Sequence, residues 1–380
     1  MKCYNALFSK YGLIKNIGNY ILLLIIITFS SSSIFFYKIG YNMLDNDIKQ
    51  ILSIKEKNEE NYNIYKYDQN GEIKQKRKKK KIKSKKSMNF INISNPTKKI
   101  KKKRVEATDS INTGKDINIH KSFSKLDIKN QKCSQMNTPQ FKEMSQSSQF
   151  KGITYTEYEL NTLSYKEALE KDKRTYQQYY FSLIRFKHPL IFSFIPVKDY
   201  NSMITKVDLF LIGFVIIYAM NALFFNESTI HQIYADKGAY NFGYFFPKIL
   251  LSFLIGHIIY TGIKYIFLSE RNILKIKYQE TRNKALDIVD DIKRCLIIKY
   301  IIFYILGVLF LILFWYYLSS FCAVYQNSQI FLIINTFISS FFSLVYPFFI
   351  NLLPTVFRFL SFKNRNREYV YKASIILQII

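Results

Sequence analysis

Residues Tyr300–Leu318 read YIIFYILGVLFLILFWYYL and contain no charged side chain. At a rise of 1.5 Å per residue, a helix of this length covers about 28 Å, which is close to the roughly 30 Å hydrocarbon core of a bilayer. A helix that is apolar on every side has no face to turn toward water. We therefore expect this segment to cross a membrane as a helix.

Four other segments are comparable: Ile17–Tyr37, Leu209–Phe225, Ile249–Leu268 and Ile330–Leu353. Backbone groups inside lipid must be hydrogen-bonded within their own segment, and the chain shows no alternating barrel pattern, so we expect helices. A short neutral turn, Gln326–Gln329, separates the last two and predicts an antiparallel helical hairpin. The first segment is longer than a signal-peptide core and lacks a small-residue cleavage site, which favours an uncleaved anchor over a signal peptide.

The 380-residue chain combines 49% hydrophobic residues with a formal charge of +28, from 55 Lys and Arg against 27 Asp and Glu. The basic residues and the apolar blocks occupy different parts of the sequence, which excludes an ordinary soluble globule. We expect an all-α membrane protein. Its predicted divisions are an N-terminal transmembrane anchor helix (1–40), a disordered polybasic cytoplasmic segment (41–150), an amphipathic juxtamembrane helix with a re-entrant or interfacial segment (151–207), and a C-terminal bundle of four transmembrane helices (208–380) with a cytoplasmic helical loop (269–298).

The direction of the spans follows from Lys and Arg residues that stay on the cytoplasmic side. The segment Lys264–Lys299 holds nine Lys and Arg against five acids, and the tail after Leu353 is also basic. Both are therefore expected in the cytoplasm, together with the long segment Lys38–Asp208. The lysines before the first span favour the opposite direction for that span, and five spans cannot satisfy both signals. We follow the four C-terminal helices, which puts the N-terminus on the other side of the membrane.

A strongly basic run lies between the first and second spans. From Lys74 to Arg104 the chain carries sixteen Lys and Arg and no acid. Self-repulsion keeps such a run unfolded, and beside an anionic leaflet each basic residue contributes about 1 kcal/mol. The residues predicted to contact anionic lipid are Lys76, Arg77, Lys78, Lys79, Lys80, Lys81, Lys101, Lys102, Lys103 and Arg104. The alternatives are a passive linker, and nuclear import or nucleic-acid binding. Few aromatic residues are available for stacking, so we expect no nucleic acid as a partner.

Two amphipathic segments border the spans. Ser164 and Glu167 form a capping-box pattern, which predicts a helix that begins at Tyr165 and has one tyrosine-rich face as far as Leu183. We expect such a helix either to lie in the headgroup plane of the bilayer or to dock on the protein's own helical bundle. A second apolar stripe lies within 274–296. It needs a partner, either the tyrosine-rich helix or another protein.

The sequence contains no catalytic constellation. Its four histidines and four cysteines show no metal-ligand spacing, and neither a glycine-rich phosphate loop nor a nucleophile elbow is present. We therefore expect no enzyme activity, no metal and no cofactor. The remaining candidates are polar residues at membrane depth, namely His257, Asn221 and Asn335. They predict hydrogen bonds between helices or, where they converge, a proton or ion pathway.

Four strings carry a resemblance to a known group: YELNTL (158–163), DKRTYQQYYFSL (172–183), NALFFN (221–226) and FCAVY (321–325). Over about residues 155–380, the sequence resembles a large group of ciliate multi-pass transmembrane proteins. The resemblance implies a shared four-helix membrane module and supplies no catalytic or ligand residues. The first 150 residues resemble no family.

These features together predict a multi-pass integral membrane protein that acts as a scaffold or tether. Its expected partners are the lipid bilayer, through anionic headgroups, and a protein bound by the cytoplasmic helices. The alternative is a channel or transporter component, which requires polar residues from different spans to face one pathway.

Overall fold

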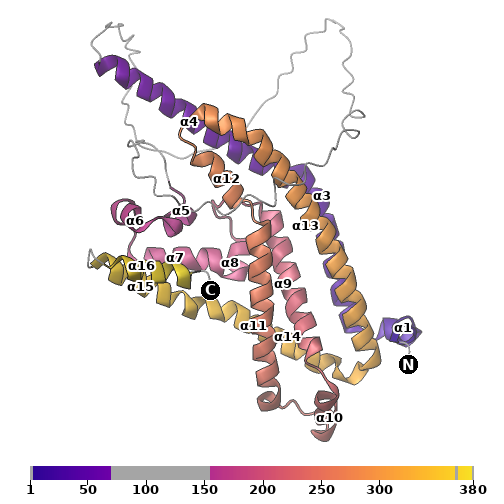
Figure 1. The fold of residues 1–380 in the computed structure, drawn as a ribbon. Coiled ribbons are helices and arrows are strands. Elements are labelled where there is room, and N and C mark those ends of the chain that lie inside the picture. The colour runs from indigo at the N-terminus through magenta and orange to yellow at the C-terminus, as the bar shows by residue number, and fades with distance from the viewer. Residues whose placement is uncertain (1–2, 70–154, 364–366, 379–380) are drawn as a thin grey trace, which may run out of the picture. The chain divides into compact units, whose positions relative to one another are not determined.

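A computed structural model describes residues 3–69, 155–363 and 367–378. Within these ranges the regular structure is helical and no strand occurs (Figure 1). Five segments are long and apolar enough to cross a bilayer. They contain α3 (Ile17–Phe35), α9 (Met203–Leu223), α11 (Phe242–Phe267), α13 (Arg282–Val324) and α14 (Gln329–Ile350). The all-α prediction is confirmed, and each predicted span coincides with one of these helices.

Polar caps fix the residues at which three of these helices begin. The side chains of Asn16, Asn241 and Thr281 each accept a hydrogen bond from the backbone N–H three residues further on. These caps satisfy donors that the start of a helix otherwise leaves unpaired. The apolar sequences that follow then continue as helix.

Helix α9 lies at the centre of the bundle. In its most apolar window 61% of the residues are buried, against 22–33% in the other four segments. It packs against α3, α11, α13 and α14, and against the short helix α8 (Pro189–Phe194). The hydrophobic core of the spanning part is therefore built around α9.

Helix α3 packs along α13, so the N-terminal anchor is an integral part of the bundle. A Cβ atom on Gly307 would lie 2.4 Å from the ring of Phe29, so the glycine lets α13 approach this fully buried ring. Nearer the start of α3, the indole of Trp315 donates a hydrogen bond to Asn19 at 2.8 Å.

The last two spans run antiparallel, as predicted, but they do not pack against each other as a hairpin. A single 3-10 turn, η3 (Gln326–Ser328), joins them, yet α14 packs against α9 and α11 and diverges from α13 (Figure 1). The reason is that α3 already covers the face of α13. After Asn351 the chain continues as α15 (Leu352–Lys363) and α16 (Glu368–Leu377), which pack against each other.

At its other end, α3 continues through the π-helical turn η1 (Phe36–Gly40) into α4 (Tyr41–Gln69). The predicted disordered segment begins at residue 41, and this boundary is too early because the described residues are helical as far as Gln69. The helix was missed because its sequence is polar and carries only a narrow apolar face.

Helix α4 lies beside the first half of α13 (Figure 1). Lys293 pairs with Asp45 at 2.6 Å, and the backbone N–H of Arg282 donates to Glu59 at 2.6 Å. Buried apolar residues of both helices belong to one core cluster. The α13 part of the apolar stripe within 274–296 therefore lies beside α4 and also packs against α12, and neither is the tyrosine-rich helix predicted from the sequence.

Four shorter helices adjoin the same end of the bundle: α5 (Glu157–Thr162), α6 (Tyr165–Lys171), α7 (Tyr176–Lys187) and α12 (Glu270–Lys277). The capping box on Ser164 and the helix start are confirmed. The single helix to residue 183 is wrong, because the chain leaves the helix at Asp172 and a second capping box on Thr175 begins α7. The hydroxyl of Tyr180 donates to the Phe348 carbonyl at 2.8 Å, so α7 docks on the protein's own helices.

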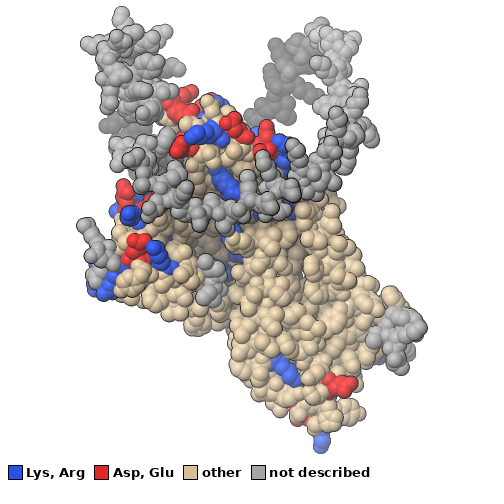
Figure 2. Space-filling model, in the orientation of Figure 1, with Lys and Arg blue, Asp and Glu red and all other residues tan. Residues whose placement is uncertain are grey.

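The spanning helices alternate in direction. The backbone N–H of Ile17 donates to Gln329 at 3.0 Å, which places the start of α3 beside the turn between α13 and α14. The short helices at this end are α1 (Cys3–Leu7), α2 (Lys10–Ile14) and α10 (Glu227–Ala235) (Figure 1). Figure 2 shows charged side chains gathered toward the opposite end, over α4, α12 and α15, with few beside α10 and an uncharged surface between. We call the end with α4 and α12 the charged end.

Candidate polar sites between the spanning helices

Asn221 joins three helices. Its side chain is buried in α9 and donates to the Ser339 hydroxyl of α14 at 3.0 Å and to the Ile217 carbonyl at 3.0 Å. Ser339 in turn donates to the Ile249 carbonyl of α11 at 3.2 Å. In lipid, such hydrogen bonds stabilise helix association because the alternative is an unsatisfied polar group in hydrocarbon.

Asn335 and His257 lie apart from Asn221. Asn335 is fully buried in α14 and accepts a hydrogen bond from the Tyr240 hydroxyl at 2.6 Å. His257, on α11, packs against the Tyr346 ring with 5.1 Å between ring centroids. The three polar residues selected from the sequence therefore bond to different partners and do not converge on one pathway.

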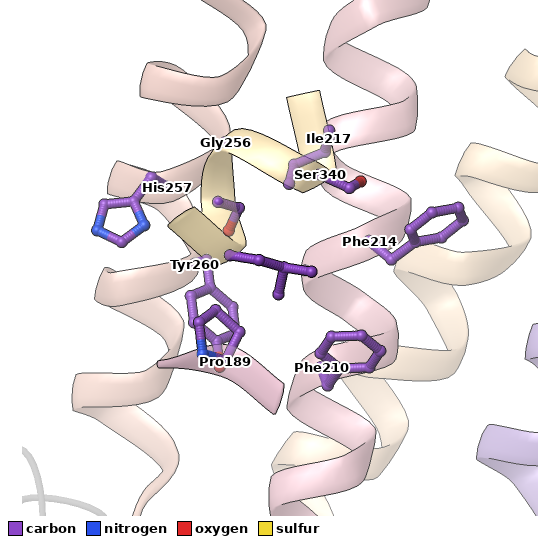
Figure 3. A pocket seen from close by; sticks show the side chains of 11 residues that line it. Pro189, Phe210, Phe214, Ile217, Gly256, His257, Tyr260 and Ser340 are labelled. Atoms are coloured by element: carbon purple, nitrogen blue, oxygen red, sulfur yellow. The ribbon is translucent and has the colours of Figure 1, made fainter. Parts of the chain in front are cut away.

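A cavity of about 60 Å³ lies between α9, α11 and α14. Figure 3 shows Phe210 and Phe214 on its α9 side, His257 and Tyr260 on α11, and Pro189 of α8 close to Tyr260. Most of the lining is apolar, although the hydroxyl of Tyr260 is buried there without a hydrogen-bond partner. A cavity of this size holds only a few water molecules, so it does not form a continuous aqueous path across the bundle.

The structure adds Asp208 to the polar residues within the spans. The second predicted span began at Leu209, after this carboxylate, whereas α9 begins at Met203 and carries Asp208 in its second turn. Asp208 is fully buried and bonds to the hydroxyls of Ser32 at 2.5 Å and Tyr304 at 3.0 Å. Sequence reasoning missed it because both partners are distant in the chain and give no local pattern.

Two buried ion pairs tie the charged end together. Lys206 of α9 pairs with Asp199 at 2.7 Å, and their side chains are 3% and 1% exposed. Lys277 of α12 pairs with Glu159 of α5 at 2.7 Å. Each charge is compensated by its partner, which is the condition for burying ionised side chains without a large penalty.

A third buried pair joins α15 to the loop between α6 and α7. Arg358 is fully buried, donates to Asp172 at 2.7 Å and packs on the rings of Tyr179 and Tyr371. Burial opposes ionisation of Asp172, but hydrogen bonds from Arg174 and the charges of Arg174 and Arg358 outweigh it, so the pKa of Asp172 is lowered. Burial raises the pKa of Tyr371 to about 12. The site stabilises an ionised Asp172.

The predicted anionic-lipid contacts, Lys76–Lys81 and Lys101–Arg104, lie outside the described residues. In the part of the chain that the structure describes, no group of three or more His, Cys, Asp or Glu side chains is arranged to hold a metal.

No family model, no curated protein and no solved structure matches the chain. The resemblance to ciliate transmembrane proteins therefore stays a prediction. The fold defines the class of protein: an α-helical, multi-pass integral membrane protein with five candidate spans. Asn221, Asn335 and Asp208 each form a hydrogen bond to another element of the bundle.

Proposed function

We propose that the protein is a membrane-anchored scaffold or tether. In this proposal the helical bundle holds the chain in the bilayer, and the polybasic segment contacts anionic headgroups or acidic protein partners. The supporting observation is that Asn221 and Asn335 bond in separate interhelical pairs, while charged side chains gather at one end. Separate pairs stabilise a rigid anchor, and the charged end presents its helices to partners.

The channel alternative has less support from the same geometry. A conducting pathway requires polar groups from several spans to line one continuous cavity. The cavity beside His257 is small and mainly apolar, and neither Asn221 nor Asn335 lines it. Of the three polar residues selected from the sequence, His257 therefore is the one that lines the cavity and supports the alternative.

Vesicle tethering tests the proposal directly. The full chain is reconstituted in neutral vesicles and mixed with anionic or neutral target vesicles, and clustering is measured by light scattering. We expect clustering with anionic targets only, reduced by salt because surface charges are screened. The triple substitution Lys101→Gln, Lys102→Gln and Lys103→Gln is expected to weaken the affinity for anionic targets by about 100-fold, since each basic residue contributes about 1 kcal/mol.

The matched control replaces three exposed basic residues of the described helices, Lys284, Arg294 and Lys372, by Gln. Clustering should be unchanged in this control, because these side chains already pair with neighbouring acids. Equal losses of vesicle clustering in the two triple variants would contradict a specific role of the lysine run. An ion or proton flux through the same vesicles that His257→Ala abolishes would replace the proposal by the channel alternative.

A further inference from the structure

A file of hydroxyl groups leads from the charged end into the bundle. Ser202, Thr205 and Asp208 are three residues apart, so they share one face at the start of α9. On α13, Tyr300 and Tyr304 are four residues apart and also share a face. The Tyr304 hydroxyl donates to Asp208 at 3.0 Å, which sets the two faces opposite each other.

Every member of this file is buried, with Ser202 at 1% exposure and Thr205 at 0%. The hydroxyls of Ser202, Thr205 and Tyr300 have no hydrogen-bond partner among the described residues. Buried hydroxyls normally form a hydrogen bond, so three such groups in one file need an explanation. Because a hydroxyl both donates and accepts, a file of this kind can pass a proton along its length.

The file ends at a carboxyl group that has no opposite charge. Among the described residues, no Lys or Arg pairs with Asp208, and the neighbouring Lys206 pairs with Asp199 instead. The titratable groups that face it are Tyr304 and, one turn away, Tyr300, both from α13. An ionised carboxylate without a counter-charge is strongly disfavoured in a buried site, so the neutral acid is favoured.

The hydrogen bonds around Asp208 fit a protonated carboxyl group. Ser32 has a single hydroxyl proton and two acceptors within reach, the Phe29 carbonyl at 2.8 Å and Asp208 at 2.5 Å. When the hydroxyl donates to Phe29, its contact with Asp208 is a hydrogen bond only if Asp208 carries a proton and donates it. The Tyr304 hydroxyl then donates to the other carboxyl oxygen at 3.0 Å.

Beyond Asp208 the file is closed. The next buried residues along the same faces carry no polar side chain, namely Ile212 on α9 and Gly307 and Leu311 on α13, with Phe29 of α3 beside Gly307. In the other direction, Lys299, which precedes Tyr300 in the chain, donates to the Leu268 carbonyl at 2.7 Å, so this end of the file lies at the charged end. Access is therefore from one end only, which allows a proton to bind without crossing the bundle.

We propose that Asp208 is a proton-binding site that exchanges with the charged end of the bundle through Thr205 and Tyr304. In the binding step one proton adds to a carboxylate oxygen of Asp208, and the group passes from an anion to a neutral acid. The protonated form donates to Ser32, whose hydroxyl then donates to the Phe29 carbonyl. Proton binding to Asp208 therefore makes the hydrogen bonds between α3, α9 and α13 depend on the proton concentration on one side of the membrane.

Infrared difference spectroscopy on the purified full chain in lipid nanodiscs tests the site. Two pH values are compared, and we expect a carbonyl stretch of a protonated carboxyl group that Asp208→Asn removes. Asparagine has the same shape as the neutral acid, so this variant is expected to keep the melting temperature of the wild type. Asp291→Asn changes an exposed carboxylate and is expected to leave the band in place. A band that survives in Asp208→Asn overturns the proposal.

The route is tested by transferring the same samples into D2O and timing the isotope shift of the band. Thr205→Val keeps the side-chain shape and removes the hydroxyl, and we expect it to slow the shift severalfold. Thr336→Val is the matched control, because Thr336 is equally buried but lies in α14 and donates to the Leu332 carbonyl. Equal exchange rates in the two variants would overturn the route through Thr205.

Discussion

Arg358 shows how a single residue fixes the junction between α15 and the helices at the charged end. Its guanidinium is fully buried, and two of its nitrogens, Nε and Nη1, have no hydrogen-bond partner. Its charge therefore depends on Asp172 and on the faces of the aromatic rings around it. A buried pair of this kind is costly to break from one side, because the remaining charge stays in a low-dielectric environment.

Asp172→Asn is expected to destabilise the protein strongly. The substitution leaves Arg358 buried without its counter-charge, which typically costs about 3–5 kcal/mol. Thermal unfolding in detergent, followed by intrinsic fluorescence, measures the loss. Asp291→Asn is the control, because that carboxylate forms an exposed pair with Arg294 and exposed pairs contribute about 0–1 kcal/mol. Similar decreases in melting temperature in the two variants would show that the buried pair stabilises the protein no more than the exposed pair does.

The same pair predicts a dependence of stability on pH. The pKa of Asp172 is lower in the folded protein than its ordinary value of 3.8, so the ionised form is favoured by folding. Its contribution is therefore fully present above about pH 4 and is lost as the pH falls through the folded pKa. We expect the melting temperature of the wild type to fall in this acidic range more steeply than that of Asp172→Asn. Parallel curves of melting temperature against pH for the wild type and Asp172→Asn would contradict a lowered pKa of Asp172 in the folded protein.

Among single residues, the sequence predicted those that differ clearly from their neighbours in the chain. Asn221 and Asn335 stand out because they interrupt apolar stretches, and both are buried between helices. Asp208 was missed because a charge beside an apolar stretch was taken as its end. Only the fold brings Ser32 and Tyr304, which are 176 and 96 residues away in the chain, to its carboxyl group.

At the scale of elements, the length of apolar segments predicted the helices but not their neighbours. A short turn between two spans constrains how far apart their ends lie, yet leaves the direction of each helix open. The packing of α3 on α13 depends on Gly307, which admits the Phe29 ring between the helices. No periodicity in the sequence indicates which glycine faces which ring.

Gly307→Val is expected to separate α3 from α13. A Cβ atom at this position would lie 2.4 Å from the Phe29 ring, so the ring or the helix must move. Overpacking of this kind typically costs about 1–3 kcal/mol. Gly262→Val is the control, since a Cβ atom there has no heavy atom within 4 Å. Melting temperatures in detergent measure the difference, and Phe29→Ala should partly rescue Gly307→Val. Equal effects of the two valine variants would contradict the packing argument.

At the scale of the whole molecule, the five candidate spans among the described residues alternate in direction, so we expect the start of α3 and the end of α16 on opposite sides of the membrane. The bond between Ile17 and Gln329 places the start of α3 at the end that also carries α10, away from the charged end. The local charges around the first span favour the reverse, but α3 packs against α9 and α13. We therefore expect the direction of α3 to follow these neighbours and their longer basic segments, against the few lysines before the first span.

Protease protection on sealed vesicles tests this arrangement. One epitope tag is inserted after Gly238, an exposed turn residue with φ of 79° at the end of α10, and another is attached to the C-terminus. Because α9, α11, α13 and α14 alternate, we expect protease added on the cytoplasmic side to remove the C-terminal tag and to leave the Gly238 tag intact. A tag at the N-terminus should also be protected, because the start of α3 lies at the same end as α10. Removal of the N-terminal tag together with the C-terminal tag would require an even number of spans, and α3 would then lie outside the bilayer core despite its apolar sequence.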